Sequence, residues 1–446
     1  MDGLGGVLCD GFGVAMGMDC LHEPGVHVVF PFASHRHSAH RRTFIEIQGQ
    51  CLPGIPGIHE RIHPLAPKIS RQSKMNSMNT SSMQKSKMVA ARPDQEENQP
   101  IPFWERILAR NLLPDAIIRI GIRRFLKNRL DLEKRGGLET QHSRLLALIE
   151  DLKRSPIAIQ TDMANRQHYE VPARFYECCL GKHLKYSCGF WKDDAGNLDQ
   201  AEEAMLDITV TRAELVDGQS ILELGCGWGS LSLWMAERFP NSQILSVSNS
   251  KSQKRHIDSQ AKLRGLQNLQ VMTVDMNDFE TDRVFDRVVS VEMFEHMRNY
   301  QSLMENISRW LSPSGKLFIH IFCHRELAYP FACNDDSDWM ARNFFTGGIM
   351  PSDSLLLYFQ ENLALEHHWR VSGVHYQRTA EAWLANMDSH HDEILALFRQ
   401  VYGPGQETRW WAYWRVFYMA CAELWGLQNG SEWFVSHYLF KNKPIQ

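Results

Sequence analysis

The strongest constraint on the fold is an alternation of strands and helices in the second half of the chain. Helical patterns are expected at 230–239, 251–263 and 300–311, between short apolar runs of strand length at 220–224, 243–247, 269–274, 286–291 and 316–321. Strands that alternate with helices form a mainly parallel sheet with helices on both faces. The sequence therefore predicts an α/β fold.

The segments on either side of this alternation divide the chain. Residues 1–98 are rich in His, Ser, Pro and Met, and we expect a mostly disordered extension, with an organelle transit peptide as the alternative. Residues 99–155 are expected to form a helical N-terminal cover. Residues 156–446 would be the main domain, with an inserted lid at about 325–380, a tryptophan-rich helical region and a closing strand at 433–440.

The cover contains a basic amphipathic helix after Pro114, in which isoleucines alternate with arginines, and a second helix at 140–154. A helix of this kind either lies on a membrane surface or packs over the core with its charges in water. The second interpretation is favoured, because most basic helices are simply solvated on one face.

Composition excludes several classes of protein. The net charge of -4 argues against nucleic acid as the main partner. The ten cysteines form neither a zinc pattern nor a disulfide framework, so no metal site is expected and reduced thiols are favoured. No run of about 18 apolar residues is present, and residues 1–30 lack the pattern of a secretory signal. These features favour a cytoplasmic protein.

A glycine-rich turn follows the first strand and predicts a ligand site. Glycines there let the backbone bend and let a ligand approach closely. The acidic residue before them suits a cationic, amino-acid-like ligand better than a phosphate, and the Gly-x-Gly-x-Gly spacing differs from the dinucleotide pattern. The turn resembles motif I of the Rossmann-like methyltransferases, which implies that S-adenosylmethionine binds at Glu223, Gly225, Gly227 and Gly229.

The ends of the next two strands supply further candidates for cofactor binding. The second strand ends without the usual acidic residue, so Asn249 or Gln253 would hold the ribose hydroxyls. The third strand is followed by Asp275 and Met276, which could bind the adenine amino group and cover the ring. For Asp275 the alternative is a helix N-cap.

Several stretches of the second part of the chain together form a specific pattern. They include QHYEVPARFYE, GKHLKYSCGFW, ILELGCGWGSLSLWMAERFP, SVEMFEHMRNY, FIHIFCHRELAY, FFTGGIMPS and YWRVFYMACAELWG. With these stretches the sequence from His168 onward resembles the plant coclaurine N-methyltransferase group, which is related to cyclopropane fatty acid synthases. The resemblance implies a class I methyltransferase with a seven-stranded sheet that acts on a small aromatic or alkaloid amine, such as a tetrahydroisoquinoline.

The segment after the fourth strand carries the predicted catalytic group. In the N-methylating members this segment has a Glu-x-x-Glu-His pattern, which is Glu292, Glu295 and His296 here. If the segment is helical, these three side chains share one face. An amine must be neutral to attack a methyl group, so carboxylates could attract the cation and His296 or Glu295 could accept its proton.

A lipid acceptor is the alternative. Cys188, His320 and Tyr376 fall where cyclopropane synthases place the groups that bind bicarbonate, although those enzymes usually lack an acidic residue at the position of Glu292. Under that alternative the basic helix would bind a membrane surface. Glu292 favours the amine, and core packing is the other explanation for Cys188 and His320.

The resemblance also implies roles for residues outside the motifs. Tyr186 and Ser187 would close over the methionine end of the cofactor, and Trp414 and Phe417 would line the acceptor pocket. Aromatic walls suit a flat amine and stabilise a cation, although core packing explains such residues equally well. The oligomeric state is left open, with a homodimer as one option.

Overall fold

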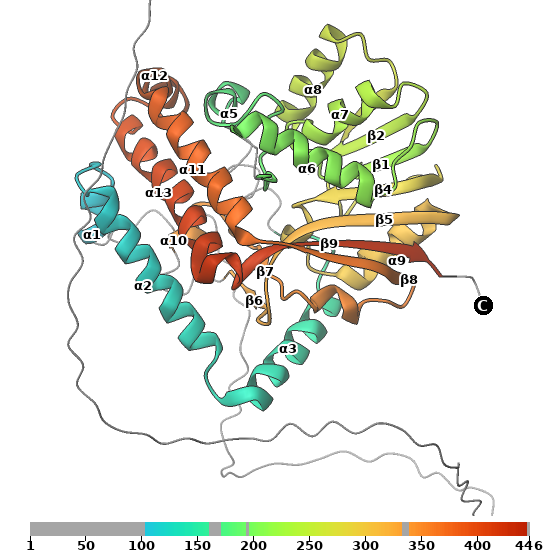
Figure 1. Ribbon diagram of the computed structural model, residues 1–446, viewed down its shortest axis with the longest axis horizontal. Coiled ribbons are helices and arrows are strands. Elements are labelled where there is room, and N and C mark those ends of the chain that lie inside the picture. The colour runs from blue at the N-terminus through green and yellow to red at the C-terminus, as the bar shows by residue number, and fades with distance from the viewer. Residues whose placement is uncertain (1–102, 160–170, 193–195, 332–338, 444–446) are drawn as a thin grey trace, which may run out of the picture. The chain divides into compact units, whose positions relative to one another are not determined.

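A seven-stranded sheet forms the centre of the fold in the computed structural model (Figure 1). Its first five strands are parallel, whereas β9 is antiparallel to β5 and β8 is antiparallel to β9. The strand order is β3-β2-β1-β4-β5-β9-β8. The strands are β1 (Ser220–Leu224), β2 (Gln243–Ser248), β3 (Leu269–Thr273), β4 (Phe285–Val291), β5 (Leu311–His324), β8 (Leu363–Val371) and β9 (Trp433–Asn442). The predicted fold class is confirmed.

The structure describes residues 103–159, 171–192, 196–331 and 339–443. All of them belong to one of the two compact units of the chain, residues 90–446. The prediction for residues 1–98 lies outside the described residues.

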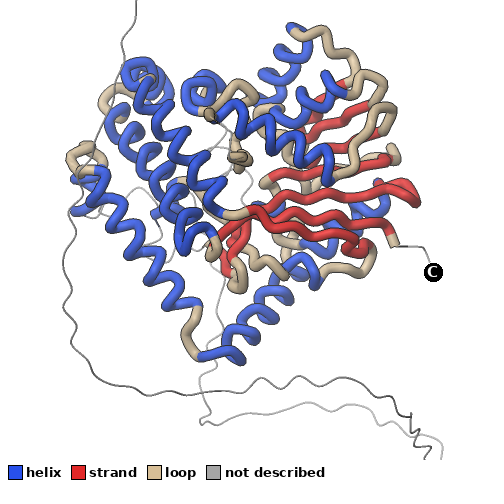
Figure 2. Tube along the Cα trace, in the orientation of Figure 1, coloured by secondary structure: helices blue, strands red, loops and turns tan. Residues whose placement is uncertain are grey.

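Helices cover both faces of the sheet because successive strand residues point to opposite sides (Figure 2). Ile221 of β1 packs in a cluster with side chains of α6 (Leu198–Arg212) and α7 (Ser230–Arg238). Its neighbour Leu222 packs in a different cluster, with side chains of α9 (Tyr300–Trp310) and of α3 (Gly137–Arg154). The helix α8 (Lys251–Leu263) contacts β2 and β3.

The predicted helical cover consists of α1 (Phe103–Leu108), α2 (Asp115–Glu133) and α3. The basic helix α2 lies beside α13 (Glu407–Gly426) (Figure 1), and Arg119 donates to Glu381 at 2.6 Å and to Glu423 at 3.1 Å. These ion pairs favour the interpretation of α2 as a packed cover. Among the described helices, none is both long and apolar enough to cross a bilayer.

The predicted insertion after the fifth strand is shorter than expected. Short elements fill the connection from β5 to β8: β6 (Tyr329–Pro330), α10 (Trp339–Asn343), β7 (Ile349–Met350) and η4 (Leu355–Tyr358). The second part of the predicted range is β8 and the start of α11 (Gly373–Ser389), so the boundary at 380 was wrong. Because β8 is a half-buried edge strand with two histidines and an arginine, it lacks the continuous apolar run of the central strands.

Candidate functional site

A first cavity opens where β1, β2 and β4 end, at the point where the strand order reverses between β1 and β4. Open α/β sheets bind their ligands at this position. The residues predicted for the cofactor that line it are Tyr186, Ser187, Glu223, Gly225, Gly227, Asn249, Gln253 and Met276. Gly229 and Asp275 are not among the lining residues.

The glycines of the turn have different tasks. Gly227 has a φ of +52° and faces open space, since a Cβ there would meet nothing within 4 Å, and it lines the cavity. Gly229 has a φ of +85°, and a Cβ there would lie 2.6 Å from Cγ1 of Ile257 in α8. Gly229 therefore allows α7 and α8 to approach each other, and its predicted contact with the cofactor is not supported.

Polar groups with spare hydrogen-bonding capacity point to a polar ligand in this cavity. Gln253 accepts from Oγ of Ser248 at 2.7 Å through its Oε1, while its buried Nε2 has no partner in the described part of the chain. Oγ of Ser230 is buried without a described partner too. Buried polar atoms are normally paired, so these atoms await a ligand or water.

Glu223 is buried at the end of β1, and Ser232 and Ser246 donate to its Oε2, the latter at 2.9 Å. Burial raises the pKa of Glu223 to about 7, and the two hydroxyls oppose that rise. A cationic ammonium group in the cavity would favour the ionised carboxylate. This geometry fits the predicted role of Glu223.

Asp275 stabilises a turn beside the cavity, between the lining residues Val274 and Met276. Its Oδ1 accepts from the backbone N–H and from the side chain of Asn277, both at 2.8 Å. Asn277 in turn bonds the backbone of Ala158, which lines the cavity. No helix follows Asp275, so the interpretation as a helix N-cap was wrong, because its short side chain bonds a neighbour in a loop. The contact with adenine stays a prediction.

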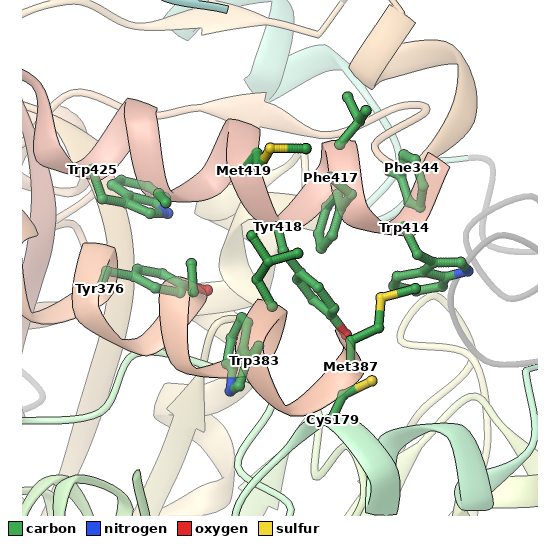
Figure 3. Close-up of a cluster of buried hydrophobic side chains, with 14 of the residues drawn as sticks. Cys179, Phe344, Tyr376, Trp383, Met387, Trp414, Phe417, Tyr418, Met419 and Trp425 are labelled. Carbon is green, nitrogen blue, oxygen red and sulfur yellow. The ribbon is translucent and has the colours of Figure 1, made fainter. Parts of the chain in front are cut away.

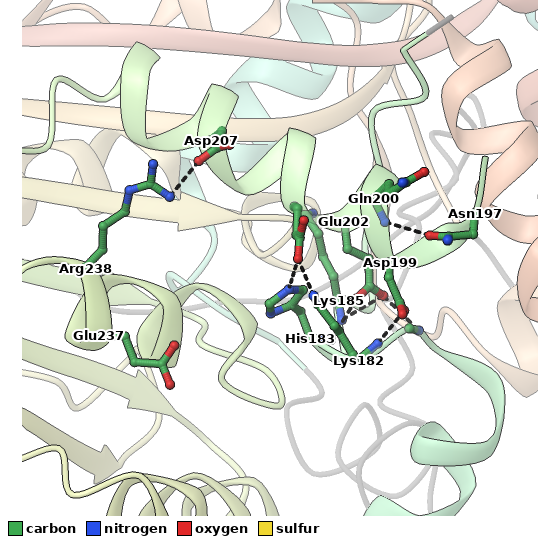
Figure 4. Close-up of polar contacts among 12 residues, drawn as sticks. Lys182, His183, Lys185, Asn197, Asp199, Gln200, Glu202, Asp207, Glu237 and Arg238 are labelled. Carbon is green, nitrogen blue, oxygen red and sulfur yellow. Dashed lines mark hydrogen bonds and ion pairs between the residues drawn. The ribbon is translucent and has the colours of Figure 1, made fainter. Parts of the chain in front are cut away.

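The Tyr186–Ser187 segment is fixed by a buried carboxylate on α6 (Figure 4). Glu202 accepts from the backbone N–H groups of Gly181, His183 and Lys185, at 3.0, 2.9 and 3.3 Å. Lys185 itself is buried, lines the cavity and donates to Oγ of Ser187. Sequence reasoning missed Lys185, because no motif marks a single lysine beside the Tyr-Ser pair.

A second cavity adjoins the first, and three residues, Tyr186, Glu292 and His296, line both. Its walls are mostly aromatic and apolar and include Phe322, Tyr329, Phe331, Phe345, Tyr376, Trp383, Phe417 and Trp425. Helix α2 contributes Phe125, Leu126 and Arg129, a role that its sequence did not reveal. Two cavities that meet at titratable groups suit a reaction between two bound molecules.

Glu292 lies at the junction, in a conformation that the sequence did not predict. The expected helix is absent at this residue, since Glu292 has a φ of +48° and only Phe294–His296 form a short 3-10 turn, η3. The side chain accepts from the backbone N–H of Cys188 at 3.0 Å and from the hydroxyl of Tyr376 at 2.6 Å. Nε2 of His320 lies 3.1 Å from its Oε1. Burial raises the pKa of Glu292, and the nearby Lys185 ammonium opposes that rise.

The other two predicted catalytic residues, Glu295 and His296, differ in whether they line the cavities. His296 lines both cavities and stacks on Phe345 with ring centroids 5.6 Å apart. Burial lowers the pKa of His296 to about 4, so its imidazole is neutral at pH 7. Glu295 lines neither cavity, and its Oε1 accepts from the backbone N–H of Phe322 at 2.9 Å. Burial and the charge of Glu292 raise the pKa of Glu295 well above its usual value.

The two aromatic residues predicted for the acceptor pocket also differ in position. Phe417 lines the second cavity, whereas Trp414 does not. Figure 3 shows Trp414 in a buried cluster with Phe344 and Tyr418, and its ring centroid lies 4.6 Å from that of Phe175. Trp414 is therefore a core residue, which was the alternative interpretation of the aromatic run.

The fold and the paired cavities define a methyltransferase that uses S-adenosylmethionine. Residues 158–427 match the family described as mycolic acid cyclopropane synthetase. The (S)-coclaurine N-methyltransferase of Thalictrum flavum subsp. glaucum is 38% identical over 336 residues, 74% of this chain and 93% of the relative. The chain therefore belongs to this family, in its coclaurine N-methyltransferase group.

Two further comparisons agree with this placement. The crystal structure of coclaurine N-methyltransferase bound to N-methylheliamine and SAH matches with a TM-score of 0.74 at 38% identity. The match covers 76% of this chain and 99% of that one. The cyclopropane-fatty-acyl-phospholipid synthase of Escherichia coli K12 is more distant, at 29% identity over 59% of this chain and 64% of the relative.

Proposed function

We propose that this methyltransferase methylates the nitrogen of a small aromatic amine of the tetrahydroisoquinoline type. The observation that carries the proposal is the position of the Glu292 carboxylate. Cys188, His320 and Tyr376, the three residues that would bind bicarbonate in a lipid-modifying relative, all contact this carboxylate. A fixed anion at the junction of the cavities suits a cationic amine, and it occupies the donors that bicarbonate would need.

The proposed binding roles follow the two cavities. The groups that would hold S-adenosylmethionine, which supplies the methyl group when bound, are Tyr186, Ser187, Glu223, Gly225, Gly227, Asn249, Gln253 and Met276. Phe417 and the other aromatic walls would hold the acceptor and stabilise its cation through their ring faces. The segment between β5 and β8 would act as a lid, because residues of it line both cavities.

In the proposed reaction, the amine nitrogen forms a bond to the methyl carbon as the carbon–sulfur bond breaks and sulfur keeps the electron pair. The nitrogen must first lose the proton that alkylamines carry at pH 7. Glu292 would attract the ammonium group to the junction, and the neutral imidazole of His296 would accept its proton. Glu295, which lies behind the cavity walls, would hold the backbone of β5 in place through Phe322.

A choice of acceptors tests the proposal directly. The protein is incubated with methyl-labelled S-adenosylmethionine and either coclaurine-type amines or vesicles of unsaturated phospholipid. We expect label in the amine, with little in the lipid, because the aromatic cavity ends at a carboxylate. Label in the acyl chains alone would contradict the amine assignment and would support the lipid alternative, with α2 at the membrane surface.

Replacement of His296 by alanine tests its role as the proton acceptor. We expect kcat for the amine to fall about 100-fold at pH 7, the lower range for loss of a general base. The defect should shrink as the pH rises toward the pKa of the amine, because more of the acceptor is then already neutral. The measurement is a pH profile of kcat, with the Kd for S-adenosylmethionine as the control. A defect that stays constant over pH would assign His296 to positioning.

The cellular location and the oligomeric state of the protein remain proposals. A cytoplasmic location is supported by free thiols at all six described cysteines, which is typical of a reducing compartment. A homodimer is one option for the assembly. Light scattering of the purified protein tests the assembly, and a monomer at micromolar concentration would contradict it.

A further inference from the structure

A continuous line of hydrogen bonds runs from the C-terminal end of α6 to the carboxylate at the junction of the cavities. NH1 of Arg212 lies 2.8 Å from Nδ1 of His437. Nε2 of His437 lies 3.0 Å from Nδ1 of His320, whose Nε2 lies 3.1 Å from Oε1 of Glu292. We name these four residues the Arg212–Glu292 chain.

The sheet holds the two imidazoles of this chain in register. His320 of β5 and His437 of β9 are direct partners across the antiparallel pair, and both side chains are fully buried. The backbone N–H of Glu292 donates to the carbonyl of His320 at 2.8 Å, which fixes the inner end. At the outer end the guanidinium of Arg212 lies over the ring of Trp369, 5.2 Å from its centroid.

Because arginine only donates, it determines which atom donates in each hydrogen bond of the Arg212–Glu292 chain. A guanidinium group only donates, so Nδ1 of His437 must accept, and neutral His437 carries its proton on Nε2. That proton is donated to Nδ1 of His320, which leaves the proton of neutral His320 on Nε2. His320 therefore donates to Glu292, as Tyr376 and the backbone of Cys188 also do.

Burial and nearby positive charges keep both imidazoles of the Arg212–Glu292 chain neutral. Burial lowers the pKa of His320 well below 6.5, and Lys185 and Arg212 lower it further. Burial, His320, Arg212 and Lys185 act in the same direction on the pKa of His437. Among the described residues, Arg212 forms no ion pair with a carboxylate, and burial lowers its pKa, so the imidazole of His437 is the polar partner that the structure gives it.

We propose that Arg212 and His437 are positioning residues for methyl transfer. Through His320 they fix one imidazole tautomer, which holds the Glu292 carboxylate ionised and oriented toward the acceptor. The chain does not carry the proton of the amine outward, because its outer end is a donor that cannot accept one. The inference rests on the proposed function, since it assigns these residues to the same carboxylate.

Replacement of His437 by leucine and by glutamine tests the proposal. Leucine removes both hydrogen bonds, and we expect kcat to fall about 10- to 100-fold, as for other partners that orient an active histidine. The KM for the amine should change much less. Glutamine offers one donor and one acceptor at similar reach, so it should restore most of kcat, which a role in packing alone would not predict.

Replacement of Arg212 by methionine gives a second readout at the outer end. Without the guanidinium, Nδ1 of His437 can take a proton, and the order of donors can reverse so that Glu292 becomes protonated. Removal of a nearby positive charge also raises the pKa of both imidazoles. We therefore expect the acid limb of the kcat profile to move to higher pH, and Arg212→Lys, which keeps a donor and a charge, should move it less.

The matched control is Arg238→Met. Arg238 lies over Trp234 at the same 5.2 Å and pairs with Asp207 (Figure 4), so this variant loses an arginine–tryptophan contact outside the chain. Its kcat and pH profile should equal those of the unmodified protein. Thermal unfolding and the Kd for S-adenosylmethionine show whether each variant is folded.

Two results would overturn the inference: equal loss of kcat with leucine and glutamine at position 437, or an unshifted acid limb in Arg212→Met. These assays use the acceptor, amine or phospholipid, that becomes labelled in the experiment with methyl-labelled S-adenosylmethionine. A failure of the amine assignment appears in the unmodified protein, whereas a failure of the Arg212–Glu292 chain appears only as a difference between variants.

Discussion

Replacement of Glu292 by glycine is expected to lower kcat for an amine acceptor by about 100- to 1000-fold, the usual effect of removing a preorganised charge from an active site. The protein should fold normally, because Glu292 has a φ of +48° that glycine adopts more easily than glutamate. Loss of the carboxylate leaves an empty anion site bounded by donors from Cys188, His320 and Tyr376. Steady-state kinetics with labelled cofactor measure the effect.

That empty site permits a sharper measurement. Formate or bicarbonate added to Glu292→Gly should restore part of the lost rate, because the three donors are already placed for a small carboxylate. Glu292→Gln is the control, since its amide fills the site and both anions should have no effect. Equal responses of the two variants, or a Glu292→Gly protein as active as the unmodified one, would remove Glu292 from the reaction.

The central strands could be predicted from sequence because their burial on both faces leaves a continuous apolar signature. β1, β2 and β4 each consist mostly of buried side chains, and the predicted boundaries agree within a residue or so. β8 has no such signature, because it is an edge strand with one partner and polar side chains. The sequence therefore predicts an insertion there.

The cofactor motif was predictable because the backbone needs glycine at particular turns, but the task of each glycine was not. Gly227 lines the cavity and Gly229 lets α7 and α8 approach closely, and only the packing of Ile257 against Gly229 distinguishes the two glycines. In the catalytic segment, too, the residues could be selected from the sequence, but their geometry could not be predicted. Glu292 and His296 both line the junction of the cavities, although a helix was the wrong reason to expect this, since Glu292 reaches the junction through a left-handed backbone.

Contacts between segments distant in sequence account for the remaining errors and omissions. Whether Trp414 or Phe417 faces the second cavity depends on how α13 is rotated against its neighbours, which a run of aromatic residues does not reveal. The Arg212–Glu292 chain joins residues from α6, β5, β9 and the position just after β4, and no local pattern links them. Side-chain partners of this kind require the folded arrangement.

Replacement of Gly227 by valine is expected to weaken binding of S-adenosylmethionine about 100-fold or more, equivalent to roughly 2.7 kcal/mol. Gly227 lines the first cavity and a Cβ at this position meets nothing within 4 Å, so we expect the new side chain to take the space of the ligand. Isothermal titration calorimetry with S-adenosylhomocysteine measures the Kd without turnover.

The substitution has a second effect that needs a control, because a side chain at a φ of +52° strains the backbone by roughly 1–2 kcal/mol. Gly265→Val provides it, since Gly265 has a φ of +72°, also faces open space and lines neither of the two adjoining cavities. Both variants should lose similar thermal stability, but only Gly227→Val should lose cofactor affinity. If both bind the cofactor normally, the first cavity is not the methyl-donor site, and the reaction assigned to Glu292 and His296 loses its second substrate.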